Sequence, residues 1–294
     1  RFSPQFFDCS DAGEQQVQYY FEDGLGYKSP TYYKTFTVVF NKSHKLLYVD
    51  QNATGTGTGT SWANAFTRLQ DALNNCGNST EGLDIYVAEG TYYPDQGNGI
   101  SPGNSQAHFL LAKNVKLYGG FPRGGADFTQ RNPEAHPTIL SGALTSGSRS
   151  NNIVTITGDN THLEGFNLRD GSSSNINGGA LLIQQSQSDS DKDHQVTVRS
   201  CKFINNRGSV YGGAVYASSV NHARYVNFVN CLFDGNSALV GGGLNLENGS
   251  NNSNLRYRLV NCIFKNNQAD QMGGALRTSP TAKAEIINCT FAYN

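Results

Sequence analysis

Three acidic residues alternate within one short polar segment: Asp189, Asp191 and Asp193. Alternating carboxylates suit a hard cation such as calcium, which prefers oxygen ligands. An EF-hand loop that began at the first of them would need Gly at its sixth position and Glu at its twelfth, where this chain has His194 and Ser200. The segment is therefore a weak calcium candidate, with a solvated loop as the alternative interpretation. We expect no other cofactor.

The residue sets that cleave polysaccharides are missing from the chain. A glycosidase needs two carboxylates at a fixed separation, and the Asn-Thr-Asp, Gly-His-Gly and Arg-Ile-Lys motifs of pectin hydrolases do not occur. The nearest match to the Arg-x-Pro-x-x-Arg pattern of pectate lyases begins at Arg131 but ends in His136, and we interpret it as a Pro-containing turn. We predict no catalytic residues and no enzymatic activity. A polysaccharide lyase or glycoside hydrolase is the alternative.

Four cysteines recur late in the chain, and their spacing invites a metal or disulfide interpretation. They are separated by 30, 31 and 27 residues: Cys201, Cys231, Cys262 and Cys289. Ligands on consecutive coils of a repeat would form a straight column, not the tetrahedron that zinc prefers. The spacing of coils would permit disulfides, but parallel side chains seldom reach the required dihedral angle, so we favour buried thiols. Cys9 and Cys76 lie outside this column and form a possible disulfide.

A Phe and an Asn accompany each of these cysteines. Phe follows by two residues: Phe203, Phe233, Phe264 and Phe291. Asn follows by five residues: Asn206, Asn236, Asn267 and Asn294. Apolar residues also lie three and five positions before each Cys. These are odd offsets from the Cys, whereas the Cys itself and the Phe lie at even offsets of zero and two. Since successive residues of a strand point to opposite faces, the chain must bend between the two pairs.

Two bends and a tight corner are expected in each repeat. Asn or Ser directly before the Cys can take the left-handed conformation of the first bend, and we expect a second bend at the Asn five residues after the Cys. A Gly-Gly signature then begins ten to twelve residues after the Cys position: residues 178–181, 212–215, 241–244 and 273–276. Small residues followed by Leu or Val predict a third strand, entered through a closely packed corner.

Each unit of about 30 residues therefore holds three short strands and has no room for a helix. One such coil cannot bury its apolar face alone, so stacked coils must form the core. The predicted fold class is all-β, a parallel β-helix whose Cys, Phe and Asn columns have a spacing of about 4.8 Å. A β-propeller is disfavoured because its blades need about 40 residues or more.

The N-terminal half is less regular, and we divide it at residue 45. Residues 45–294 are assigned to the β-helix domain and residues 1–44 to an aromatic-rich extension with a strand-like run at 32–40. Residues 61–75 predict an N-terminal capping helix, with apolar side chains at helical spacing and Ser61 as its N-cap. A solenoid needs its open end covered, and an amphipathic helix can do that.

Net charge and hydropathy exclude two partner classes. The formal net charge is -1, from 22 basic and 23 acidic residues. This near balance gives no electrostatic reason to expect a nucleic acid or an acidic membrane as partner. The chain also contains no run of 18 apolar residues, so we predict no membrane span.

Several stretches resemble a known family. Tyr-Val-Asp at 48–50, Ser-Trp-Ala-Asn-Ala-Phe at 61–66 and Ile-Tyr-Val-Ala-Glu-Gly-Thr-Tyr at 85–92 resemble the capping opening of secreted right-handed parallel β-helix repeat proteins, and Leu-Tyr-Gly-Gly-Phe at 117–121 continues the likeness. The later Gly-Gly-Ala and Phe-x-x-Asn repeats are similar to those of polymorphic outer-membrane proteins and related surface passengers. The resemblance covers about residues 46–294. It implies a right-handed β-helix on an exported, often adhesive, cell-surface protein.

The functional prediction is a non-enzymatic structural or adhesive β-helix protein, extracellular or on the cell surface. The expected partners are copies of the chain that associate end to end, a surface anchor, or glycans and other molecules of a host or neighbouring surface. Because the repeat at Asn294 is not followed by a Gly-Gly strand, we expect further chain or another subunit to complete that coil. Residues 1–44 could lie across a neighbour's open end and build a filament. A carbohydrate-binding or polysaccharide-cleaving β-helix is the alternative function.

Overall fold

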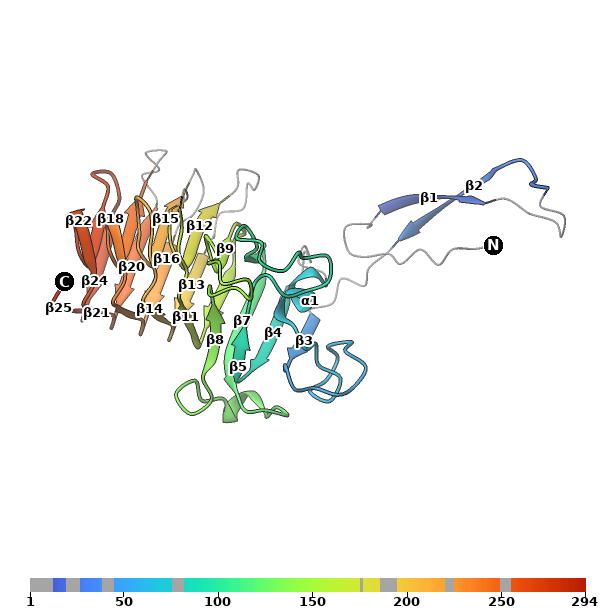
Figure 1. Cartoon of the computed structure of the whole chain (residues 1–294), viewed down its shortest axis with the longest axis horizontal. Coiled ribbons are helices and arrows are strands. Elements are labelled where there is room, and N and C mark those ends of the chain that lie inside the picture. Colours follow the sequence, from blue (N-terminus) through green and yellow to red (C-terminus); the bar gives the residue numbers. More distant parts are fainter. Residues whose placement is uncertain are drawn as a thin grey trace.

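Three parallel sheets run the length of a β-solenoid of about six turns (Figure 1). The structure, a computed structural model, describes residues 13–19, 27–38, 45–75, 82–174, 177–185, 195–219, 225–248 and 255–294. The parallel β-solenoid predicted from the repeats is confirmed.

Each complete coil contributes one strand to each sheet, and strands pair with the corresponding strands of the coils before and after. The first sheet has eight strands: β3 (Lys45–Val49), β4 (Leu83–Ala88), β7 (Val115–Phe121), β10 (Thr161–Glu164), β13 (Gln195–Arg199), β16 (Tyr225–Val229), β20 (Arg256–Val260) and β24 (Ala284–Ile287). The second sheet has seven: β5 (Gly90–Tyr92), β8 (Thr138–Ser141), β11 (Phe166–Arg169), β14 (Lys202–Ile204), β17 (Leu232–Asp234), β21 (Ile263–Lys265) and β25 (Thr290–Ala292).

The third sheet closes each coil. It has six strands: β6 (Phe109–Leu111), β9 (Val154–Ile156), β12 (Leu181–Gln185), β15 (Val215–Ser219), β19 (Leu244–Glu247) and β23 (Leu276–Thr278). In the last two coils that have a third-sheet strand, a further pair of parallel strands precedes it: β18 (Ser237–Val240) and β22 (Gln268–Met272). The inward side chains of the three sheets meet in one continuous apolar core.

Alternation along each strand decides which side chains enter that core. On β16, Val226 and Phe228 are buried, whereas Tyr225, Asn227 and Val229 face outward and are half-buried. The next coil repeats this pattern in register, because β16 pairs residue by residue with β20. Stacking in register therefore converts a repeated residue into a column.

The first expected bend lies where the repeat places it, but the second is displaced by one residue. Left-handed backbone occurs directly before each Cys, with φ of 49°, 54°, 54° and 51°: Ser200, Asn230, Asn261 and Asn288. The second left-handed residue lies four positions after each Cys, not five: Asn205, Gly235, Asn266 and Tyr293. The expectation of a bend at the fifth position was wrong, because the Asn there points its side chain into the core directly after the bend.

The helix predicted at 61–75 is much shorter. Helix α1 covers Leu69–Asn74, and Arg68 before it is extended. Phe66 instead pairs with β3: its backbone N–H donates to Tyr48 and its carbonyl accepts from Asp50, both at 2.9 Å. Backbone pairing with β3 at Phe66 thus replaces the predicted helix at that residue. α1 contacts β3 and β6 and buries Leu69 in the core, and its role as a cap stays a prediction.

The described part of the N-terminal extension forms a hairpin. Strands β1 (Gly13–Tyr19) and β2 (Tyr32–Val38) pair in antiparallel register in a two-stranded sheet of their own. The strand-like run expected at 32–40 thus contains β2. Tyr27 and Tyr33 are exposed to 73% and 57%. An assembly role for residues 1–44 stays a prediction.

Candidate functional site

The phenylalanine column fills the centre of the regular coils. Neighbouring rings stack almost parallel, with centroids 4.9, 4.4 and 4.9 Å apart from the first pair to the last: Phe203, Phe233, Phe264 and Phe291. The first three are fully buried, and Phe291 on the outermost coil is 46% exposed. A column of this kind rigidifies the solenoid and offers nothing to a ligand.

The asparagine column satisfies backbone groups at the bend beside those rings. Asn206 Nδ2 donates to Asn236 Oδ1 at 3.0 Å and to the Leu168 carbonyl at 3.1 Å. The same Asn236 oxygen accepts the Asn206 backbone N–H at 3.0 Å. Asn236 repeats the arrangement with Asn267, and Asn267 repeats it with Asn294. Since the first three amides are almost fully buried, each hydrogen bond replaces one with water.

The cysteine column consists of free thiols. Cys231 Sγ lies 3.5 Å from the Val198 carbonyl and 3.4 Å from the Val229 carbonyl, to which it donates. Burial raises the pKa of the Cys201 thiol to about 12. The Cys201 thiol therefore stays protonated at neutral pH and acts as a small core residue, not as a nucleophile.

A different group of side chains lies on the outer face of the first sheet in the N-terminal coils. Three tyrosines occupy one register position on successive strands: Tyr48 on β3, Tyr86 on β4 and Tyr118 on β7. All three are half-buried, and the residues beside them point into the core. Neighbouring tyrosines meet edge to face, with ring centroids 5.8 Å apart for both pairs.

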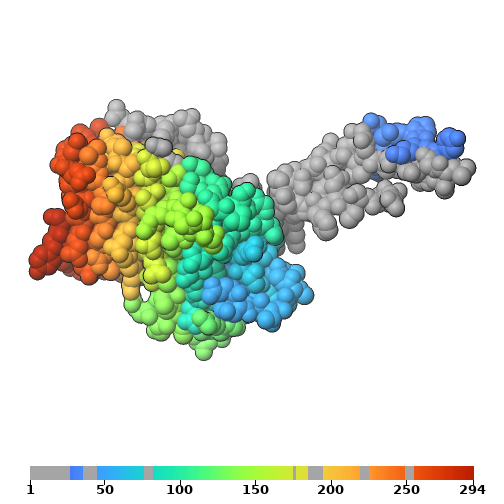
Figure 2. All heavy atoms as spheres, viewed as in Figure 1, coloured from blue at the N-terminus to red at the C-terminus, as the bar shows by residue number. Residues whose placement is uncertain are grey.

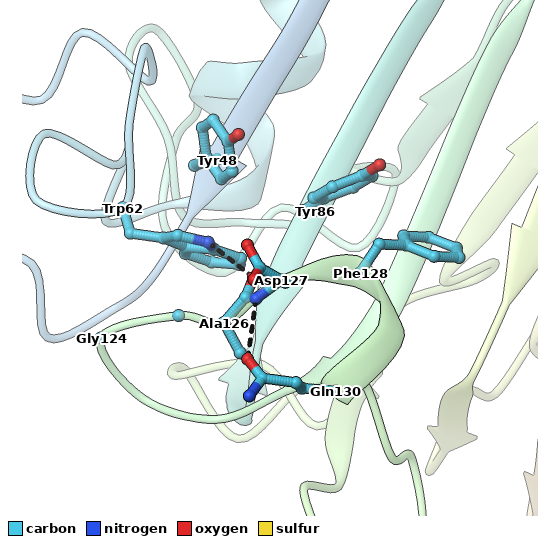
Figure 3. A pocket seen from close by; sticks show the side chains of 9 residues that line it. Tyr48, Trp62, Tyr86, Gly124, Ala126, Asp127, Phe128 and Gln130 are labelled. Carbon is cyan, nitrogen blue, oxygen red and sulfur yellow. Dashed lines mark hydrogen bonds between the residues drawn. The ribbon is translucent and has the colours of Figure 1, made fainter.

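Two loops complete a hollow beside Tyr48 and Tyr86, and we call it the aromatic recess (Figure 3). The loop after β3 contributes Trp62, and the loop after β7 contributes residues 124–128 and Gln130, including the 3-10 turn Phe128–Gln130. The volume of the hollow is about 420 Å³. Figure 2 shows the two loops as neighbouring blue and green surfaces at one edge of the solenoid.

Backbone contacts fix the two loops to each other. Trp62 Nε1 donates to the Ala126 carbonyl at 3.2 Å. Gly124 N–H donates to Asp50 Oδ2 at 2.7 Å. Gly125 has a φ of +84°, and a side chain there would collide with the Trp62 ring, so only glycine brings the loop this close. These contacts therefore fix the positions of the two loops that line the recess.

An ion-pair network supports the recess from one side. Arg131 Nη1 and Glu164 Oε1 are 2.8 Å apart, and the Arg131 side chain is only 8% exposed. His162 Nε2 lies 2.6 Å from Glu164 Oε2. Burial opposes ionisation of Glu164, but hydrogen bonds from His162 and Arg131 outweigh it and lower the pKa of the carboxyl to about 2. The Arg131 guanidinium also lies over the rings of Tyr118 and Phe128, 5.6 and 5.4 Å from their centroids.

Comparison with protein-family models gives one match, over residues 200–218. The matching family is the Chlamydia polymorphic membrane protein (Chlamydia_PMP) repeat. Residues 200–218 of this chain are therefore similar to that repeat. The matched stretch contains Cys201, Phe203 and Asn206 and the Gly-Gly-Ala corner, and with the parallel solenoid it confirms the predicted resemblance. No curated protein and no solved structure matches the chain.

The polymorphic-membrane-protein repeat implies association with an outer membrane or a cell surface. Within the part of the chain that the structure describes, none of the helices combines the length and apolar character that crossing a bilayer requires. The repeat match lies in the regular coils, whereas the aromatic recess lies in the coils before residue 165. The match therefore assigns no role to the recess.

The candidate residues predicted from the sequence fall into two groups. The calcium candidates Asp189, Asp191 and Asp193 and the cysteines Cys9 and Cys76 lie outside the described residues. The ladder residues lie in three columns within the solenoid, as given above. Among the described residues, no group of three or more His, Cys, Asp or Glu side chains could hold a metal ion.

Sequence analysis did not identify the aromatic recess. The stretches around Tyr48, Trp62 and Tyr86 were interpreted as a capping motif, and the stretch from Arg131 as a turn. The turn is present, since His136 N–H donates to the Asn132 carbonyl at 2.8 Å, but the Arg131 side chain is part of the network beside the recess. The sequence signal that could have revealed the recess was an outward aromatic residue between inward residues on several successive strands.

Proposed function

We propose that this chain is a non-enzymatic, surface-associated β-helix protein that is displayed outside the cell and acts in adhesion. The observation that carries the proposal is the polymorphic-membrane-protein repeat within an unbroken parallel solenoid. Stacked Phe rings and the hydrogen-bonded Asn column continue from coil to coil, which gives the rod a rigid interior. A rigid rod suits the presentation of loops and surface side chains to another surface.

The ionisation of Glu164 makes this carboxyl group a poor candidate for a hydrolytic role. A glycosidase needs one carboxyl group that is protonated near neutral pH. Glu164 has a pKa of about 2 and is already engaged by Arg131 and His162. It is therefore unsuited to act as a general acid. Incubation with uronate polymers and neutral glycans, with and without calcium, tests this point, and product release that depends on a single acidic or basic residue would contradict it.

Adhesion is tested with beads that carry the purified chain at a fixed surface density. The proposal predicts saturable retention of the beads on cell or glycan-coated surfaces that exceeds retention of beads coated with an unrelated protein of equal net charge. Soluble chain added in excess should compete and reduce retention at least tenfold. Retention equal to that of the control beads on every surface would contradict the adhesive proposal.

End-to-end self-association is a second candidate, favoured by the outermost coil. Ile286 on β24 and Phe291 on β25 are each 46% exposed, although their partners in the coil before, Leu259 and Phe264, are fully buried. A further layer of chain or a second copy would cover these side chains. Sedimentation velocity over a hundredfold concentration range tests the second possibility: growth of larger species with concentration supports it, and a constant monomer contradicts it.

A further inference from the structure

We propose that the aromatic recess binds a neutral saccharide, with hexopyranose rings lying against the Tyr48, Trp62 and Tyr86 side chains and sugar hydroxyls bound by Asp127 and Gln130. The proposal names the ligand class of the adhesive surface and rests on the proposed function for its biological role. It does not involve a bond-breaking step.

The aromatic rings form one contiguous surface, which we call the platform, in which Tyr48 and Tyr86 meet edge to face and Trp62 is tilted by 59° against Tyr48. Trp62 lies 4.8 Å from Tyr48 and 5.1 Å from Phe121, and Phe121 stacks under Tyr86 at 4.8 Å, all between ring centroids. Phe121 is fully buried and supports the others from below. Because neighbouring rings touch, no cationic group fits between them, and a ligand must lie across their exposed sides. The C–H face of a pyranose is attracted to the negative face of an aromatic ring.

Polar groups stand at the rim of this platform, where sugar hydroxyls would lie (Figure 3). Asp127 and Gln130 are exposed there. Gln130 Oε1 accepts the Asp127 backbone N–H at 3.2 Å, and the Asp127 side chain accepts the Gln130 backbone N–H, so this capping box positions both side chains. Within the part of the chain that the structure describes, the Gln130 amide nitrogen donates no hydrogen bond, so it can donate one to a hydroxyl. An apolar floor with a few polar groups is typical of small-ligand sites of this volume, about 420 Å³.

The charges around the recess favour a neutral ligand. Arg131 is the cation of the ion-pair network beside the recess. Glu164 neutralises its charge, with 2.8 Å between Arg131 Nη1 and Glu164 Oε1. Asp127 adds a carboxylate at the rim, and Asp50 holds the loop beneath through Gly124. An acidic sugar would therefore meet a carboxylate with no free cation among the lining residues. Uronate oligomers are the disfavoured class.

Trp62 is the only tryptophan of the chain, so its fluorescence reports on the recess alone. The experiment titrates the purified full chain with cellohexaose and with chitohexaose, and in parallel with an oligogalacturonate and with choline. Isothermal titration calorimetry of the same pairs gives an independent measure of binding. The proposal predicts a saturable response to at least one neutral hexasaccharide in both measurements and at least tenfold weaker binding of the other two probes.

Two recess variants and one matched control assign the binding to the platform. Tyr86→Ala removes a central ring, and Phe128→Ala removes a ring that is 44% exposed on the loop and should leave the fold intact. Tyr225→Ala removes an outward tyrosine from the same sheet, on β16, far along the solenoid. We expect at least tenfold weaker saccharide binding for the first two variants, with unchanged circular dichroism for Phe128→Ala, and no change for the control.

Other outcomes would overturn the proposal. These are no saturable binding of either neutral hexasaccharide up to millimolar concentration, stronger binding of choline or oligogalacturonate, or equal effects of Phe128→Ala and Tyr225→Ala. The bead assay separates this failure from that of the adhesive function. Beads that adhere although no saccharide binds would overturn only the assignment of the recess, whereas saccharide binding without bead adhesion would overturn the adhesive proposal.

Discussion

The regular coils after residue 195 and the coils between residues 45 and 165 obey the same strand-pairing rules but use their side chains differently. In the regular coils, repetition fills the interior with identical Phe, Asn and Cys columns. In the earlier coils, the interior is a varied apolar core, and long loops turn back onto an outer row of tyrosines. The repeated residues therefore pack the interior of the regular coils, whereas the aromatic recess lies in the coils in which the repeat is interrupted.

The largest expected effect in this comparison is the loss of a ring from the regular interior. Phe233→Ala removes a fully buried ring stacked between Phe203 and Phe264, and the coils above and below cannot collapse into the space. We expect the free energy of unfolding to fall by about 3–5 kcal/mol. Urea denaturation measures it. The same substitution at Phe291, which is 46% exposed, should cost less than half as much, and equal costs would contradict the column.

A smaller loss is expected from the polar column. Asn236→Val leaves the Asn206 side chain and backbone N–H without their acceptor and the Phe203 carbonyl without its donor. Buried polar groups without partners should lower the free energy of unfolding by about 2–4 kcal/mol in total. Asn227→Val on the outward face of β16 is the control and should have little effect. A harmless Asn236→Val would mean that the bend is stable without its hydrogen bonds.

The fold of the regular coils could be predicted from the sequence because their residues repeat. Identical residues at constant spacing leave few arrangements, so parallel coils and inward rings such as Phe233 follow from parity and spacing. The assignment of the second bend to Asn206 was off by one residue, because Asn suits a left-handed bend as well as an inward hydrogen bond, and spacing does not choose between them.

The early coils were less predictable for a different reason. Helical spacing within residues 61–75 suggested one helix, but Phe66 gains backbone pairing with β3, which no local pattern reveals. The aromatic recess needs Trp62 and residues 124–128 to meet, and their proximity depends on the path of two loops more than 60 residues apart along the chain. The sequence shows outward-facing tyrosines on successive strands, but it does not show that they form the floor of the aromatic recess.

In the early coils, the ion pair beside the recess predicts a pH-dependent contribution to stability. The folded-state pKa of Glu164, about 2, lies below its ordinary value of 4.5, so its contribution is complete above pH 4.5 and is lost as the pH falls toward 2. We expect Glu164→Gln to lower the free energy of unfolding by about 1–2 kcal/mol at pH 6 and by almost nothing at pH 2, allowing for solvent screening. Thermal melts from pH 2 to 6 measure this. Glu134→Gln, at an ion-paired carboxylate whose side chain is 75% exposed, should show no such difference.

The smallest expected effect concerns the rim of the recess. Phe128→Ala removes a 44% exposed side chain from a loop, so the free energy of unfolding should change by no more than about 0.5 kcal/mol. A much larger change, in the range expected for Phe233→Ala, would place Phe128 in the framework and weaken the contrast between the two regions. Urea denaturation of both variants under the same conditions makes the comparison.

The most direct test of the account compares bead adhesion by Phe128→Ala with that by Ile263→Ala. Both side chains are exposed to a similar extent, 44% and 45%, but Phe128 lines the recess and Ile263 lies on β21 in the regular coils. We predict at least a tenfold loss of retention for Phe128→Ala and none for Ile263→Ala. Equal retention by the two variants would contradict the claim that the interrupted coils carry the binding surface.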